Sequence, residues 1–281
     1  MMKATDPLHL AVAATALLLT MGAAPGAEDV SRWDGDARSA ARLIAGSQQT
    51  AGVLRAGVEV RLKPGWHTYW RYPGDAGTPP QFDFKGSQNV AQVRELWPAP
   101  ERIVEAGGST IGYVRDFIFP LQVLAQDAAN PVTLRLKLNY GICEKYCAPA
   151  DANVELALGK GPTSRDAALA LAERRVPKKV ALGEGGPLAI RVVRREDGPV
   201  RPRVIVDVAA PAGSALDLFA EGPTPHWALP LPEKIDGAPA GMQRFAFELD
   251  GLPPDASDRG ALITLTAVTP DDAIEVATRL D

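Results

Sequence analysis

The stretch "VTLRLKLNYGICEKYCAPADANVELAL", residues 132–158, decides the fold of the first half of the chain and holds the only two cysteines. Apolar and polar residues alternate in "VTLRLKLNY" and again in "NVELAL", which is the period of a β-strand with one buried face. Cys143 and Cys147 lie between these two segments, and Pro149 follows them. The pattern predicts two strands, with the cysteines at the tip of a hairpin or at an edge-strand connection.

Strand patterns also dominate the rest of the chain. The segment "VLRAGVEVRL" alternates before the cysteines, and "LAIRVVRR", "RVIVDVAA", "RFAFELD" and "ALITLTAV" do so past Gly183, with turn-forming clusters between them. In between, "TSRDAALALAERRVPKK" predicts a helix that Thr163 or Ser164 caps and Pro177 stops. We expect an all-β protein with two immunoglobulin-like β-sandwich domains, residues 30–160 and 181–281, joined by a short helix-containing linker, residues 161–180.

The start of the chain predicts export. After Lys3, "LHLAVAATALLLTMGAA" is apolar and leads into small residues before the charge of Glu28, which is typical of a secretory signal peptide over residues 1–26. The apolar run is shorter than the roughly 20 residues of a membrane-spanning helix. We therefore expect a bacterial periplasmic protein that is not inserted in the membrane after cleavage. The net charge of −4, with both signs interspersed, predicts no nucleic-acid partner.

The spacing of the cysteines limits what they can form. On one straight strand their Cα atoms would lie roughly 13 Å apart, beyond the reach of a disulfide, so the chain must turn if they pair. A bridge closing five residues contributes only about 2 kcal/mol, and a large domain has a sufficient core without it. This favours a redox-active disulfide with no further cofactor. Lys145 would favour a thiolate and Glu144 would oppose it.

Two alternatives use the same cysteines. Cys143 and Cys147 could bind copper(I), with His67 as a third ligand, because thiolates suit this soft ion. Zinc fits poorly, since the only other imidazole past the leader, His226, lies in the expected second domain. The other alternative is a non-catalytic interaction module in which the disulfide is structural. No hydrolase or phosphate-binding motif is present.

An aromatic stretch, "LKPGWHTYWRYPGDAGTPP", occupies residues 62–80. Its pattern favours a strand of which the side chains on one face, those of one parity, fill the core. An alternative is that the side chains of the other parity form a lid over the cysteines that shields them from stray oxidants. The candidates for this lid are Tyr69, Tyr72, Trp70 and His67.

Several separated motifs together resemble a known family. "GWHTYWRYPGDAGTPP", "LWPAPER", "GYVRDFIFPLQV" and "YGICEKYCAPADANVEL", in this order, resemble the periplasmic N-terminal domain of the DsbD and ScsB thiol:disulfide reductases, also described as a disulfide bond corrector domain, over about residues 35–160. The second half looks like the further β domain of the ScsB-like members. The best-known members place five residues between the cysteines, whereas the ScsB-like branch has the spacing of three seen here.

The resemblance implies an immunoglobulin-like sandwich whose two cysteines, Cys143 and Cys147, shuttle between dithiol and disulfide. Cys147 would form mixed disulfides, and Cys143 would resolve them. The implied partners are a membrane-embedded thiol reductase or a thioredoxin-like donor, and periplasmic disulfide-containing proteins as acceptors. Because the sequence ends at Asp281 without membrane or thioredoxin-like domains, we expect the electron donor to be a separate protein.

Overall fold

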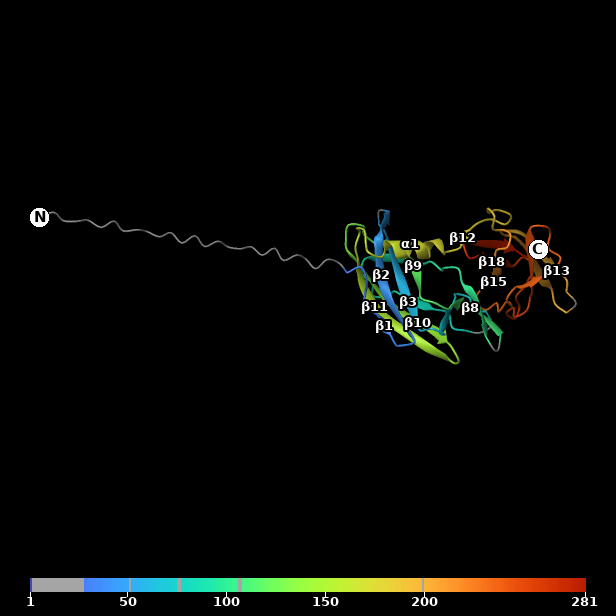
Figure 1. Cartoon of the computed structure of the whole chain (residues 1–281), viewed down its shortest axis with the longest axis horizontal. Coiled ribbons are helices and arrows are strands. Elements are labelled where there is room, and N and C mark those ends of the chain that lie inside the picture. The colour runs from blue at the N-terminus through green and yellow to red at the C-terminus, as the bar shows by residue number, and fades with distance from the viewer. Residues whose placement is uncertain (2–27, 51, 75–76, 106–107, 199) are drawn as a thin grey trace.

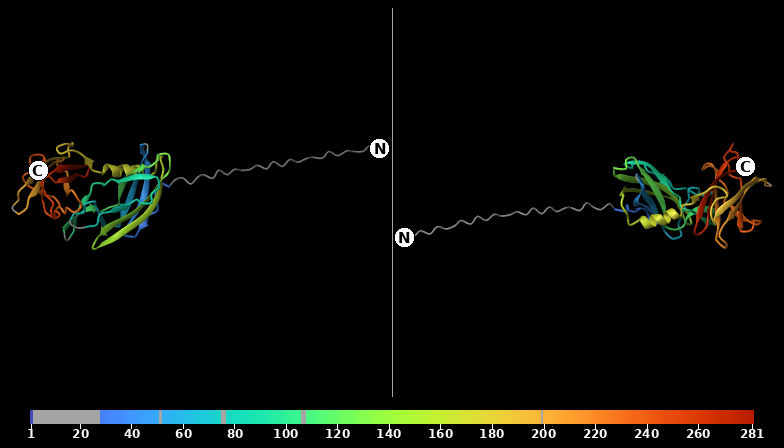
Figure 2. Two further views of the ribbon diagram at one scale, coloured as in Figure 1. Left: turned by 180° about the vertical axis from the view of Figure 1, so that it is seen from behind. Right: turned by 90° about the horizontal axis from the view of Figure 1, so that it is seen from above.

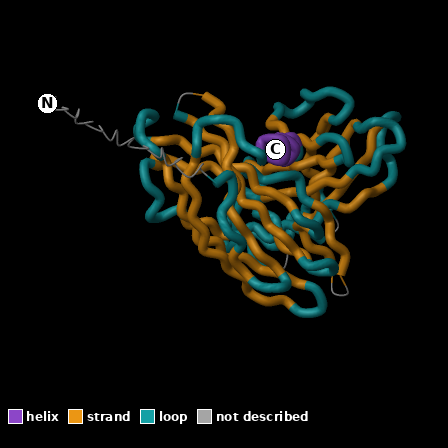
Figure 3. The backbone as a smooth tube through the Cα atoms, turned by 60° about the vertical axis from the view of Figure 1, so that its left-hand side comes forward, coloured by secondary structure: helices purple, strands orange, loops and turns teal. Residues whose placement is uncertain are grey.

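The computed structural model places the chain in two sandwiches that lie side by side (Figure 1). It describes Met1 and residues 28–50, 52–74, 77–105, 108–198 and 200–281. The predicted signal peptide, apart from Met1, lies outside the described residues. Strands make up most of the described chain, and one helix accompanies them (Figure 3). The predicted all-β sandwich architecture is confirmed.

The first sandwich consists of two sheets. One has the strand order β1-β2-β3-β9-β6, and the other has the order β11-β10-β4-β8-β7, with β5 paired to β10. All pairings in these two sheets are antiparallel. The bounds are β1 Asp34–Gly35, β2 Ser39–Thr50, β3 Val53–Leu62, β4 His67–Tyr69, β5 Gln81–Asp83, β6 Val90–Glu95, β7 Glu101–Glu105, β8 Gly108–Tyr113, β9 Phe117–Ala125, β10 Val132–Cys143 and β11 Cys147–Leu158.

The core of the first sandwich is formed by the inward-facing side chains of these strands. Leu134, Leu136 and Leu138 of β10 are fully buried, as the alternation predicts, and they belong to the same apolar cluster as Val58 and Phe119 of the opposing sheet. Burying such side chains stabilises the fold by about 1.5–3 kcal/mol each. This core fixes β10 and therefore the position of the cysteine hairpin at its end.

The helix α1, Asp166–Arg174, packs on the first sandwich rather than standing free between the two (Figure 1). Its buried Leu169 lies where β2 and β3 carry Gly46 and Gly57, and a Cβ at either glycine would come within 3 Å of this leucine side chain. The predicted cap by Thr163 or Ser164 is wrong. Arg165 is the N-cap residue and no side chain caps it, while the Thr163 hydroxyl donates to the carbonyl of Ala45 and accepts from the Arg165 backbone N–H.

The second sandwich also consists of two sheets, with the strand orders β12-β19-β18-β15 and β13-β14-β17-β16. Its core is continuous and apolar and includes Phe219, Phe247 and Leu265. The bounds are β12 Lys178–Lys179, β13 Ala189–Glu196, β14 Arg203–Ala209, β15 Asp217–Glu221, β16 Glu233–Ile235, β17 Met242–Glu248, β18 Leu262–Val268 and β19 Ala273–Arg279.

The two sandwiches touch over a junction that the additional views show from behind and from above (Figure 2). Side chains of β7 and of the segment after β4 meet β15 and β19 there. No helix among the described residues is long and apolar enough to cross a membrane.

Candidate functional site

The cysteines occupy the tip of the β10–β11 hairpin, and they face each other across it. Their Cα atoms lie 4.1 Å apart as a directly paired position of the ladder, and their sulfur atoms form a disulfide. The turn consists of three residues, 144–146, closed by a hydrogen bond from the Glu144 backbone N–H to the Tyr146 carbonyl. The hairpin prediction is confirmed, and the tight turn explains how a spacing of three residues allows the bridge.

The two sulfur-bearing residues differ in exposure. Cys143 is 1% exposed, whereas Cys147 is exposed to solvent at the edge strand. The cause is the strand order, since the end of β10 lies between β11 and β4, while β11 has a neighbour on one side only. Cys147 is therefore the exposed residue of the pair, and Cys143 is the buried one.

Tyr69 of β4 covers the disulfide. Its hydroxyl lies 2.8 Å from Cys143 Sγ and 3.6 Å from Cys147 Sγ. Its ring lies over Gly141, which shares a strand face with Cys143 because residues two apart point the same way. A Cβ at Gly141 would lie 3.0 Å from Tyr69 Cε2, so a glycine at this position gives the ring room to reach the sulfur. Burial raises the pKa of the Tyr69 hydroxyl, with a smaller contribution from Glu105, and the group remains a proton donor at neutral pH.

His67 lies beside Cys143 on the neighbouring strand β4. It pairs with Cys143 in the β4–β10 ladder, and its ring meets Tyr69 edge-on with 5.5 Å between centroids. Its Nε2 atom is buried without a hydrogen-bond partner, and the nearest carboxylate oxygen, on Glu105 of β7, lies 3.6 Å away. Burial lowers the pKa of His67, although Glu105 opposes this, so the imidazole is neutral at pH 7.

Two of the other predicted site residues lie at the junction with the second sandwich. Trp70 packs against Phe219 of the second sandwich, and the Tyr72 hydroxyl bonds to backbone carbonyls there. The aromatic side chains on both faces of this stretch are buried, so the stretch serves the core and the junction. Among the four lid candidates, Tyr69 is the one whose hydroxyl lies at hydrogen-bonding distance from the sulfur atoms. Glu144 and Lys145 are exposed at the turn.

Sequence reasoning missed two side chains at the site. Glu105 approaches His67 from β7, and Tyr146, 58% exposed in the turn, packs its ring edge-on against Trp66 at 5.3 Å. An exposed tyrosine between two cysteines was a signal available in the sequence, whereas the approach of Glu105 depends on a distant strand. Among the described residues, no group of three or more His, Cys, Asp or Glu side chains is arranged to hold a metal ion.

Comparisons with known proteins found a matching family model and a similar solved structure. Residues 37–158 match the family model described as "Thiol:disulfide interchange protein DsbD, N-terminal". The whole fold is similar to the crystal structure of the N-terminal periplasmic domain of ScsB from Proteus mirabilis, with a TM-score of 0.70 and 19% identity, covering 90% of this chain and 98% of that one. No curated protein matches the chain.

Proposed function

From the assignment of residues 37–158 to the DsbD N-terminal domain family, we propose that the protein is a periplasmic thiol:disulfide interchange protein that passes reducing equivalents to partner proteins through Cys143 and Cys147. The observation that carries the proposal is the asymmetry of the disulfide: one sulfur belongs to an exposed residue, and the other is buried beneath a tyrosine hydroxyl. A bridge that only stabilised the fold would need neither feature.

The exposed Cys147 is the exchanging residue. In the reduced protein its thiolate attacks a partner disulfide, forming a mixed disulfide while the second partner sulfur leaves as a thiolate. The Cys143 thiolate then attacks Cys147 Sγ, which restores the internal disulfide and releases the first partner sulfur. Two electrons have passed to the partner, and the leaving thiolates take up protons according to their pKa.

Reloading reverses these steps. A thiolate of the donor, either a membrane-embedded thiol reductase or a thioredoxin-like protein, attacks the exposed Cys147 Sγ, and Cys143 leaves with the electron pair. The second donor thiol then releases Cys147. The arrangement needs no bound cofactor, because both electrons are carried by the sulfur atoms.

The test is a pair of single substitutions in the mature chain, assayed for reduction of a disulfide-containing protein by a thioredoxin-like donor. Cys147→Ser should abolish exchange, whereas Cys143→Ser should accumulate a covalent mixed disulfide with the partner that dithiothreitol releases. Exchange that survives Cys147→Ser would refute the proposal. The reduction potential of the wild-type pair should lie between roughly −120 and −270 mV, the range of exchange proteins, and not below about −300 mV, the range of structural bridges.

A further inference from the structure

The three residues that follow Tyr69 are anchored on the second sandwich. The Arg71 guanidinium donates from Nε and Nη2 to the two carboxylate oxygens of Glu221, at 2.9 and 2.6 Å, and Nη2 also bonds to Glu275. Burial lowers the pKa of Arg71, but the two carboxylates outweigh this and raise it, so the cation persists at every working pH. Charge-assisted, forked contacts of this kind are among the strongest that a side chain makes.

The residues on either side of Arg71 add to this anchor. The Tyr72 hydroxyl bonds to the backbone carbonyls of Trp227 and Leu229, at 2.8 and 3.0 Å. The Trp70 ring lies 6.1 Å from Phe219 between centroids and 4.3 Å beneath the Arg71 guanidinium carbon. Three consecutive residues therefore contact the second sandwich, which fixes the backbone of the segment in place.

The ring of Tyr69 has little freedom of its own. Gly77 lies on one side and Gly141 on the other, and a Cβ at these positions would come within 2.5 and 3.0 Å of the ring. The hydroxyl can stay at 2.8 Å from Cys143 Sγ only if the backbone at residue 69 keeps its position. That backbone continues directly into the anchored segment.

We propose that the second sandwich positions the redox site: by anchoring Arg71 through Glu221 and Glu275, it holds the Tyr69 hydroxyl against Cys143 Sγ, where the hydroxyl stabilises the thiolate that forms when the disulfide opens. Arg71 is thus a positioning residue that acts through Tyr69. This inference rests on the proposed exchange function, and it gives the second sandwich a role in the chemistry of the first.

The stabilised species is defined by the bonds that change. When a donor thiolate attacks Cys147 Sγ, the bond between the two cysteine sulfurs breaks, a bond between Cys147 and the donor forms, and the electron pair stays on Cys143 Sγ. This buried thiolate has no access to water, so an unpaired negative charge there would be unfavourable. Tyr69 keeps its proton and donates a hydrogen bond to the sulfur. The reduced form gains more from this bond than the disulfide does, because hydrogen bonds to ionised groups are stronger.

The experiment compares the reduction potentials of variants of the mature chain, equilibrated in glutathione buffers. Tyr69→Phe removes the donor, while Arg71→Gln and the double substitution Glu221→Gln with Glu275→Gln remove the anchor from either side. Each should lower the equilibrium constant for reduction about tenfold, which is a shift of about 30 mV to more negative potential for a two-electron couple. Arg71→Lys, which keeps the charge, should recover part of the shift.

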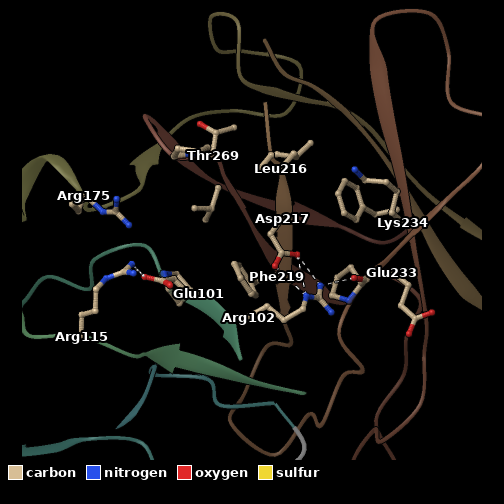
Figure 4. Close-up of a pocket in the computed structure, with 16 residues that line it drawn as sticks. Glu101, Arg102, Arg115, Arg175, Leu216, Asp217, Phe219, Glu233, Lys234 and Thr269 are labelled. Carbon is tan, nitrogen blue, oxygen red and sulfur yellow. Dashed lines mark hydrogen bonds and ion pairs between the residues drawn. The ribbon is translucent and has the colours of Figure 1, made fainter. Parts of the chain in front are cut away.

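The matched control is the other interdomain ion pair, shown in Figure 4. Arg102 bonds to Asp217, at 2.8 Å from Nη2 to Oδ1, and to the Pro232 carbonyl, in a pocket of about 740 Å³ between the sandwiches that neither cysteine lines. Arg102→Gln loosens the junction without touching residues 69–72, so it should leave the potential unchanged. Far-ultraviolet circular dichroism of each variant confirms that it is folded.

The outcomes separate this inference from the function on which it rests. If the wild-type protein exchanges disulfides but the potential is the same in the glutamate double variant as in wild type, the positioning role is wrong and the function stands. If Arg102→Gln shifts the potential as much as Arg71→Gln does, general loosening explains the effect and the inference also fails. If wild type does not exchange disulfides, the proposed function fails. A shift of the reduction potential in Tyr69→Phe would then still support the contact between the Tyr69 hydroxyl and Cys143 Sγ.

Discussion

The two sandwiches are built alike, but buried titratable groups in them differ in how completely they are hydrogen-bonded. In the second sandwich, Asp207 of β14 is 2% exposed, and both of its carboxylate oxygens accept hydrogen bonds from Arg244 on the neighbouring strand, at 2.6 and 2.9 Å. In the first, the buried His67 has an Nε2 atom without a hydrogen-bond partner, and the Tyr69 hydroxyl faces sulfur. A buried polar group with all of its hydrogen-bond partners stabilises a fold, whereas one that lacks a partner beside a reactive atom is typical of a functional site.

The difference arises from the strand order. Asp207 and Arg244 are directly paired on adjacent strands of one sheet, so their contact follows from the register. His67 and Tyr69 lie on β4, a strand of three residues inserted between β10 and β8 that joins the cysteine hairpin to the junction. The same sandwich architecture therefore holds a fully paired buried ion pair in one half and the candidate site in the other.

The largest expected effect on stability comes from breaking the hydrogen-bonded pair of Asp207 and Arg244. Asp207→Ala removes the two hydrogen bonds that the buried carboxylate accepts from Arg244, and we expect the free energy of unfolding to fall by about 2 kcal/mol. Urea denaturation of the mature chain measures this loss. Glu155→Ala, which breaks the exposed ion pair with Arg135, is the control and should change stability by less than about 1 kcal/mol. A loss as small for Asp207→Ala as for the control would contradict the comparison.

The next effect acts on the site itself. Gly141→Ala places a methyl group 3.0 Å from Tyr69 Cε2 and 3.1 Å from Thr78 Cβ, which displaces the ring. Overpacking of this kind destabilises by about 1–3 kcal/mol, and the reduction potential should shift because the hydroxyl leaves Cys143. Gly159→Ala is the matched control, since a Cβ there has no neighbour within 4 Å. Equal potentials in Gly141→Ala and wild type would show that the ring tolerates the methyl group without moving.

The cysteine hairpin could be predicted from the sequence because the alternation on its two sides fixes which faces are buried. The alternation ends at Tyr140, after which Gly141, Ile142 and Cys143 are all buried. The physical cause is long-range: β4 pairs with this end of β10, and Tyr69, 74 residues before Cys143, covers its outer face. A single strand's pattern contains no information about a covering side chain from so far away.

The aromatic stretch was harder to interpret for a related reason. Alternation along a strand predicts that one face fills the core and that the other face is free to form a lid. Instead, Trp66, Tyr69, Trp70 and Tyr72 are all buried. Parity distinguishes two faces only when one of them meets solvent, and here the segment leaves β4 of the first sandwich and enters the junction with the second sandwich. The start of α1 was mispredicted because long-range contacts position it: the Asp166 carboxylate accepts a hydrogen bond from the Ser47 backbone N–H of β2, and the Thr163 hydroxyl donates to the Ala45 carbonyl.

A smaller effect concerns the pH dependence of stability. The pKa of His67 is lowered below its usual value by burial, so the unfolded chain binds the proton more tightly than the folded protein does. Stability should therefore be full above about pH 6.5, the ordinary pKa of histidine, and should fall as the pH drops below it. His67→Leu should remove this part of the dependence in denaturation curves, without a large loss of stability at pH 7. A dependence between pH 7 and 5 that is unchanged in the variant would assign it to other groups.

The smallest expected effect on stability is at an exposed carboxylate of the first sandwich, between β1 and β2. Asp36 accepts hydrogen bonds from the side chain and backbone of Arg38 and from the backbone of Ser39, which lowers its pKa to about 2. Because the folded pKa lies below the unfolded one, the stabilisation is present above about pH 4 and is lost as the pH falls towards 2. Solvent screening limits it to less than about 1 kcal/mol, so Asp36→Asn should lower stability slightly at pH 7 and not at pH 2. A loss of stability at pH 2 as large as that at pH 7 would contradict this prediction, because it would assign the effect to something other than the charge of the Asp36 carboxylate.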